Sequence, residues 1–152
     1  FKGTDEDRKS ALMELSEPLQ HIAQTLKLDT NHVLDLGDDF KEIVNAANLF
    51  GARWLNDHPL VLIDLTRVLD VLKERKDYIL MLTLLDGYVR QAMYELLDID
   101  GFKPFKLEPF TNTVNMTRVS RMLEEIEKAN QLLSSNVNPT LVFESMIIRL
   151  KG

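Results

Sequence analysis

Residues 77–97 read DYILMLTLLDGYVRQAMYELL, and their apolar side chains recur at the spacing of one long α-helix. The expected inner stripe comprises Tyr78, Met81, Leu82, Leu85, Val89, Ala92, Met93 and Leu96. Ile79, Leu80 and Leu84 widen this stripe, so we expect the helix to be buried on more than one side. A helix with so wide an apolar face needs neighbours around it, which indicates a helical bundle.

Helical spacing continues on both sides of this segment. Apolar residues follow it through residues 4–26, 38–54, 59–72, 115–133 and 138–151, and no segment shows sustained strand alternation. The expected N-caps are Thr4, Ser16, Thr30 or Asn31, Asp38 or Asp39, Asn115 and Asn138. The apolar, proline-containing residues 98–114 are expected to form a connection that packs on the bundle. The sequence therefore predicts an all-α, compact bundle of about five to seven helices.

Composition narrows the class of protein. The chain has 152 residues, of which 45% are hydrophobic and 28% charged, so it is about one domain long and is neither disordered nor fibrous. It contains no cysteine, which excludes disulfides, thiolate nucleophiles and cysteine-ligated zinc, and fits a reducing, cytoplasmic environment. No apolar run approaches the roughly 18 residues of a membrane span, so no membrane association is expected.

Charge and glycine spacing argue against nucleotide and nucleic-acid binding. The net charge is −6, and residues 1–100 hold 19 acidic and 11 basic side chains. Because phosphate backbones are bound mainly by clustered Lys and Arg, we expect little or no direct nucleic-acid binding. The six glycines are too dispersed for a Walker A loop or a dinucleotide fingerprint, which need several within a few residues.

One acidic cluster invites a metal-binding interpretation. Asp35, Asp38, Asp39 and Glu42 lie close together in sequence, and aspartate-rich segments on helical folds can hold magnesium with diphosphate. The cluster also lies where a helix should begin, and the helix dipole favours acids there without any metal. A diphosphate site needs a second acidic segment facing the first, and none is present. We therefore favour helix capping.

Other polar residues give weaker indications. His21, His32 and His58 are isolated in sequence, so surface or capping roles are favoured over metal or base roles. Residues 102–106, FKPFK, resemble a small platform for stacking single-stranded bases, but a loop pinned by its phenylalanines explains them better. No catalytic residue, cofactor or metal site is predicted.

The segment 139–150 is unusually apolar for a terminal helix. Its apolar residues are Leu141, Val142, Phe143, Met146, Ile147, Ile148 and Leu150. Either this helix threads the middle of the bundle, or its second face meets another protein. The expected inner stripe comprises Val142, Phe143, Met146, Ile147 and Leu150. Leu141, Glu144 and Ile148 lie off that stripe and are the candidate subunit-contact residues.

Residues 134–144, SSNVNPTLVFE, carry a resemblance to a known family. A helix that ends in an Asn-x-Asn turn, followed by an apolar helix with an early Glu, resembles the C-terminal domain of the delta-prime subunit of the bacterial DNA polymerase III clamp loader. The long helix with Tyr88-Val89-Arg90, the linker and the helix over 119–133 support it. The resemblance covers residues 38–152 in pattern and 132–150 as a motif; the same domain type closes the tau/gamma subunits.

This resemblance implies an architectural role. In that family the C-terminal domains of five subunits form a helical collar, which holds the ATPase modules in the ring that loads the sliding clamp onto primed DNA during replication. Residues 38–152 would be the collar domain, and residues 1–37 the end of a preceding lid domain. The implied partners are the delta and tau/gamma subunits. The chain would be non-catalytic, and the nucleotidyltransferase activity would belong to the parent DNA-directed DNA polymerase.

Two alternatives remain open from the residues alone. The first is an unrelated helical module for protein interaction or oligomerisation. The second is an all-α, metal-dependent enzyme that uses the acidic cluster.

Overall fold

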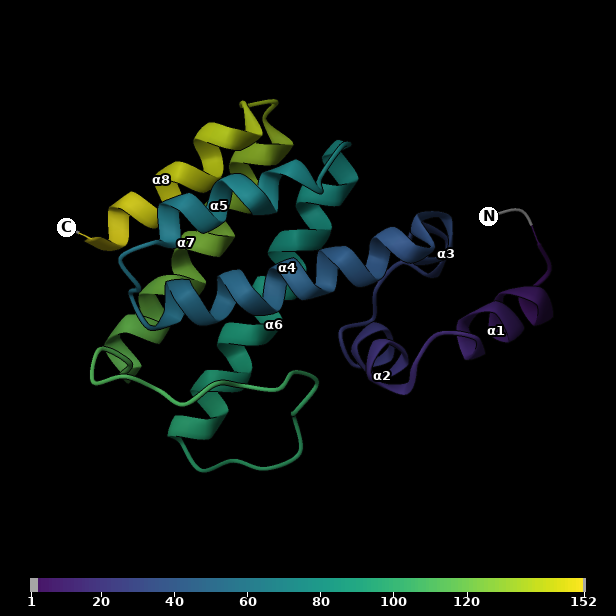
Figure 1. Ribbon diagram of the computed structural model, residues 1–152, viewed down its shortest axis with the longest axis horizontal. Helices are drawn as coiled ribbons and strands as arrows, with labels where there is room; N and C mark the ends of the chain where they lie inside the picture. Colours follow the sequence, from purple (N-terminus) through teal and green to yellow (C-terminus); the bar gives the residue numbers. More distant parts are fainter. Residues whose placement is uncertain (1–2, 152) are drawn as a thin grey trace.

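The long central helix predicted from residues 77–97 is α6, Arg75–Leu96 (Figure 1). The computed structural model describes residues 3–151. Helix α6 begins slightly earlier than predicted because Asp77 Oδ2 accepts the Glu74 backbone N–H at 3.0 Å, which fixes the first turn. Leu80 and Leu84 are buried as expected, whereas Ile79 is exposed.

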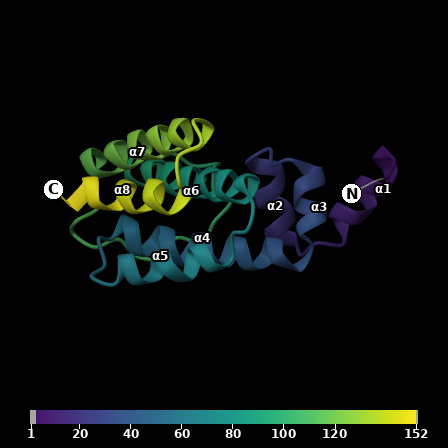
Figure 2. The same ribbon diagram turned by 90° about the horizontal axis from the view of Figure 1, so that it is seen from above.

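Two helices pack directly on α6, and two more complete the bundle. Helices α4 (Asp38–Leu55) and α7 (Met116–Ser134) both contact α6 directly. Helix α5 (Val61–Asp70) packs on α4, and α8 (Pro139–Lys151) packs on α7 and α5. Figure 2 shows α4 and α5 along one side of the bundle and α7 along the other. Helix α8 thus closes the bundle between α5 and α7.

Three short helices form the N-terminal end of the described chain. They are α1 (Asp5–Met13), α2 (Glu17–Thr25) and α3 (Thr30–Leu36), and they extend beyond the bundle at the start of α4 (Figures 1 and 2). Helices α2 and α3 bury Ile22 and Val33, while α1 has no buried residue. Residues 3–151 therefore contain eight helices and no strand. The all-α prediction is confirmed, and the helix count exceeds seven because residues 30–36 form a helix of their own.

The predicted N-caps of three helices are confirmed. Thr4 Oγ1 accepts the Asp7 N–H at 3.1 Å, and Asn115 Oδ1 accepts the Arg118 N–H at 2.9 Å. Asn138 Oδ1 accepts the Thr140 N–H at 2.9 Å. These side chains satisfy backbone donors that have no partner within the helix.

Two predicted caps are wrong. Helix α3 is capped by Asp29, whose Oδ1 accepts the N–H groups of Asn31 and His32. Helix α4 follows Gly37, whose φ of +57° lies in the left-handed region, so Asp38 and Asp39 fall in its first turn. Gly37, which adopts this conformation without steric cost, therefore occupies the N-cap position expected for an aspartate.

Two glycines set the distances between helices. A Cβ on Gly51 of α4 would lie 2.9 Å from the Tyr88 ring, so α4 approaches α6 closely at this point. A Cβ on Gly87 of α6 would lie 2.7 Å from Leu26, which follows α2. The absence of side chains at these positions lets α4 and the N-terminal segment pack onto α6.

The connection between α6 and α7 lies against the bundle, as predicted. Gln91 Nε2 donates to the Phe105 carbonyl oxygen at 2.7 Å, and the Phe105 N–H donates to Gln91 Oε1 at 2.8 Å. Farther along, the Thr111 N–H donates to Asn56 Oδ1 at 2.8 Å. One buried glutamine thus holds both backbone groups of the residue at the middle of this connection.

Candidate protein-interaction face

Helix α8 has two populations of apolar side chains. The expected inner stripe is buried throughout: Val142, Phe143, Met146, Ile147 and Leu150. Leu141 and Ile148 are each 56% exposed, and Glu144 is half-buried. The predicted division of this helix into a core side and an outer side is therefore present in the fold.

Helix α5 continues this outer side. Leu62 and Ile63 are 42% and 57% exposed, and Leu60, just before α5, is also exposed. Since α5 packs directly on α8 and Leu62 lines one groove with Ile148, Leu62 extends the apolar surface that α8 presents. Together the outer sides of α5 and α8 form what we call the α5–α8 face. Sequence reasoning missed the α5 contribution, although Leu62 and Ile63 lie off the buried side of that helix, which comprises Val61, Asp64, Leu65 and Val68.

A groove of about 480 Å³ runs between the two helices. Its lining residues are Leu62, Leu65, Thr66, Leu69, Asp70, Thr140, Glu144 and Ile148. Two of the three predicted contact residues, Glu144 and Ile148, therefore line one groove, while Leu141 lies outside its lining. The groove has an aliphatic lining with two carboxylates and two threonine hydroxyls, which suits it to a protein partner.

The Asn-x-Asn turn positions α8 on the bundle. Asn136 adopts a φ of +63°, a conformation that asparagine tolerates better than most residues. Its Oδ1 accepts a hydrogen bond from Arg75 Nη2 at 3.1 Å, and Arg75 Nη1 donates to the Leu133 carbonyl at the end of α7. Asn138 then caps α8. Each asparagine of the motif has a separate structural role, and both help to set the direction of α8.

Ion pairs hold the far end of α8. Arg149 pairs with Glu125 of α7 at 3.4 Å, and Lys151 pairs with Asp57 at 3.6 Å. The Arg149 carbonyl oxygen also accepts a hydrogen bond from Arg121 at 3.1 Å. With both ends held, the exposed residues of α8 occupy a fixed surface.

The acidic cluster is not gathered into a metal site. Across residues 3–151 no group of three or more His, Asp or Glu side chains is placed to hold a metal ion. Asp38 and Asp39 lie in the first turn of α4, where the helix dipole favours negative charge. The geometry thus agrees with a role at the helix start, although Gly37 is the cap.

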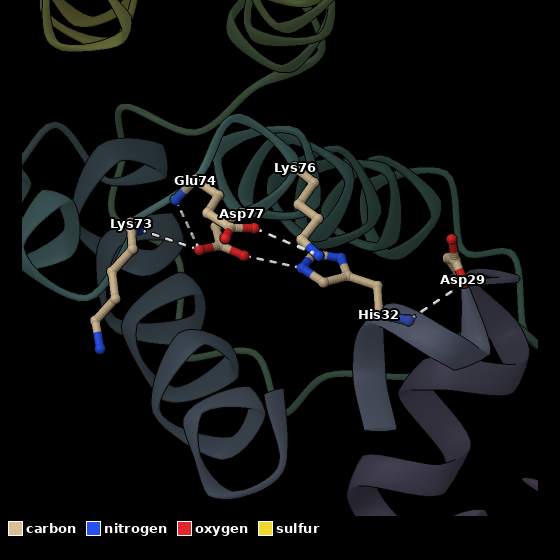
Figure 3. Close-up of polar contacts among 6 residues, drawn as sticks. All are labelled: Asp29, His32, Lys73, Glu74, Lys76 and Asp77. Carbon is tan, nitrogen blue, oxygen red and sulfur yellow. Dashed lines mark hydrogen bonds and ion pairs between the residues drawn. The ribbon is translucent and has the colours of Figure 1, made fainter. Parts of the chain in front are cut away.

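His32 departs from the surface or capping role expected of it (Figure 3). Its Nε2 lies 2.8 Å from Asp77 Oδ1, and the two side chains are only 10% and 6% exposed. Asp77 Oδ2 accepts the N–H groups of Lys73 and Glu74. The His32–Asp77 pair ties α3 to the first turn of α6. Because the two residues are 45 positions apart in the sequence, no local pattern predicts their contact.

The pKa of Asp77 reflects competing influences. Burial alone would raise this pKa, but hydrogen bonds from the Glu74 N–H, from His32 and from the Lys73 N–H outweigh burial. The pKa therefore lies below its ordinary value of 3.8, and the carboxylate stays ionised at neutral pH.

The aromatic residues of 102–106 do not form an open platform. Phe105 is buried, with its ring centroid 5.7 Å from that of Tyr88, and Phe102 packs edge-on against Tyr94. Lys103 pairs with Asp100. These contacts agree with the interpretation of a loop pinned by its phenylalanines.

No helix within residues 3–151 combines the length and the apolar character needed to cross a membrane. A scan against protein-family models found no match to this chain, and searches of curated proteins and of solved structures found none either.

Proposed function

We propose that this chain is the subunit-assembly (collar) domain of a DNA polymerase III clamp loader. The observation that carries the proposal is the outer side of α8, where Leu141 and Ile148 are exposed although the other large apolar side chains of the helix are buried. Exposed apolar side chains beside an aliphatic groove on a packed bundle are typical of a protein-interaction site.

The proposal has a general and a specific part. The general part, a helical domain that binds another protein, is supported by the α5–α8 face. The specific part, membership of a clamp loader, is supported by the resemblance of residues 132–150, in which the two asparagines of the turn direct α8. The partners would then be the delta and tau/gamma subunits. The chain itself would be non-catalytic and would act in the cytoplasm.

Co-assembly with clamp-loader subunits tests the specific part. Mixing the chain with delta and tau/gamma should give a complex detectable by light scattering. Leu141→Ser and Ile148→Ser should each weaken this complex about thirtyfold, as substitutions at interface hot spots do. Ile79→Ser on α6 is a matched control, because Ile79 is also exposed but lies on another helix. Absence of a complex with the unmodified chain would overturn the clamp-loader assignment.

The same face also supports a second candidate, a helical interaction module unrelated to clamp loaders. Such a module could bind a second copy of itself. Sedimentation of the chain alone distinguishes this self-association from co-assembly with other subunits. If the chain dimerises and Ile148→Ser abolishes the dimer, the face is an oligomerisation surface of the chain itself.

A further inference from the structure

We propose that the groove between α5 and α8 holds an amphipathic helix of a partner protein, and that this helix presents aliphatic side chains flanked by Lys or Arg. This inference rests on the proposed assembly role and names the chemistry of the partner. It concerns the groove lined by Leu62, Leu65, Leu69 and Ile148, with Asp70 and Glu144 among its lining residues.

The position of the groove suits a helix. It lies between two packed helices, and two of its aliphatic lining residues, Leu62 and Ile148, are 42% and 56% exposed. A partner helix inserts residues spaced i, i+3, i+4 and i+7 into a groove of this kind. The threonine hydroxyls of Thr66 and Thr140 add polar contacts beside these aliphatic anchors.

The negative charge of the groove favours basic residues beside the aliphatic residues of the partner helix. Of residues 3–151, the ionisable ones that line it, Asp70 and Glu144, are both acidic, and none is basic. Among the described residues neither carboxylate takes part in a hydrogen bond or an ion pair through its side chain. A partner with Glu or Asp at its flanks would meet like charge, whereas Lys or Arg would supply the missing counter-charges. The same acids disfavour an anionic ligand such as a phosphate backbone.

The test uses two synthetic peptides of equal length as probes of the 152-residue chain. Both carry Leu at i, i+3, i+4 and i+7; one carries Lys at the flanking positions and the other Glu. Fluorescence anisotropy should show the Lys peptide binding about tenfold more tightly than the Glu peptide at low salt. Because a chain of net charge −6 attracts any basic peptide, this difference needs a control at constant net charge.

Two double variants supply that control. Asp70→Asn with Glu144→Gln removes both groove carboxylates and should reduce the preference for Lys to less than about threefold. Glu124→Gln with Glu127→Gln makes the same change in net charge at α7, away from the groove, and should leave the preference intact. Equal losses in the two double variants, or equal affinities of the unmodified chain for both peptides, would overturn the inference. A dimer of the chain that the groove variants abolish would also overturn it, because a second copy would then be the occupant.

The outcome separates this inference from the proposed function. If clamp-loader subunits do not bind but the Lys peptide binds in a groove-dependent manner, the clamp-loader assignment fails and the groove inference stands. If the subunits bind and neither the groove variants nor the peptide charge matters, the groove inference alone fails.

Discussion

Gln91 holds the connection between α6 and α7 with both polar ends of its side chain. Gln91→Leu should leave the N–H and C=O of Phe105 without partners, and each buried, unsatisfied group costs about 1–3 kcal/mol. We expect urea unfolding to show a loss of about 2–4 kcal/mol. Gln131→Leu, at an exposed position of α7, should change stability by less than about 0.5 kcal/mol. Similar stabilities for the two variants would contradict this role.

Asp77 is expected to matter through its charge. Asp77→Asn should destabilise the chain by about 1–3 kcal/mol at pH 7, because His32 and two backbone N–H groups lose an ionised acceptor. Asp39→Asn, in the first turn of α4, removes only a charge–dipole contribution of about 0.3–1 kcal/mol and serves as the control. Chemical denaturation of both variants measures the difference.

The same carboxylate predicts a direction for the pH dependence. Because the pKa of Asp77 in the folded chain lies below 3.8, its stabilising contribution is present above the unfolded-state pKa and is lost as pH falls through the folded-state pKa. The stability gap between the unmodified chain and Asp77→Asn should therefore shrink below about pH 4. Denaturation curves at several acidic pH values measure it, and a gap that widens on acidification would contradict the assignment.

At the scale of elements, α8 is expected to respond to substitution in two ways. Phe143→Ala, which empties a fully buried position, should cost about 3–5 kcal/mol of folding free energy. Leu141→Ser and Ile148→Ser change exposed positions and should cost less than about 1 kcal/mol. Thermal unfolding monitored by circular dichroism distinguishes the two classes. Equal destabilisation by Phe143→Ala and Ile148→Ser would show that both sides of α8 serve the core.

Elements were predictable where their signals are local. The stripe of α8 and the caps Asn115 and Asn138 depend on residues within one turn or one helix, so periodicity and capping chemistry were enough. The predicted aspartate cap of α4 is wrong because Gly37 adopts a left-handed conformation, which cannot be inferred from the residue types around it. The exposed position of Ile148 follows from the periodicity of its helix, but the groove beside it could not be predicted, since the groove depends on α5 lying next to α8.

At the scale of the whole molecule, the three N-terminal helices, α1 to α3, differ in how closely they pack on the bundle. Helix α1 buries no residue, whereas Ile22 and Val33 join the core and His32 reaches α6. A chain that begins at Glu14 should therefore keep nearly full stability. A chain that begins at Asp38 should lose at least about 3–6 kcal/mol, because the large buried side chains Ile22 and Val33 contribute about 1.5–3 kcal/mol each, and buried Ala23 and the His32–Asp77 pair are lost as well. Urea unfolding of both truncated chains checks this, and a larger loss in the first would contradict it.

The long-range contacts of the molecule were the part that sequence could not supply. His32 and Asp77 are 45 residues apart, and nothing in either neighbourhood marks the other as its partner. The contact between Leu26 and Gly87 is a similar case, because a glycine within a helix does not indicate which side chain will pack against it. Helix content and the buried stripes follow from local physics, while these pairings follow only from the assembled fold.

The position of α8 has a consequence for how the protein is made. Helix α8 covers α7 and α5 but follows both in the chain, so α5 and α7 leave the ribosome before α8 does. Until residues 139–151 leave the ribosome, the apolar side chains that later face Phe143 and Met146 remain open to water and to other nascent chains. Completion of the bundle therefore requires residues 139–151, and a chain truncated before residue 139 would expose these apolar side chains to chaperones in place of a folded domain.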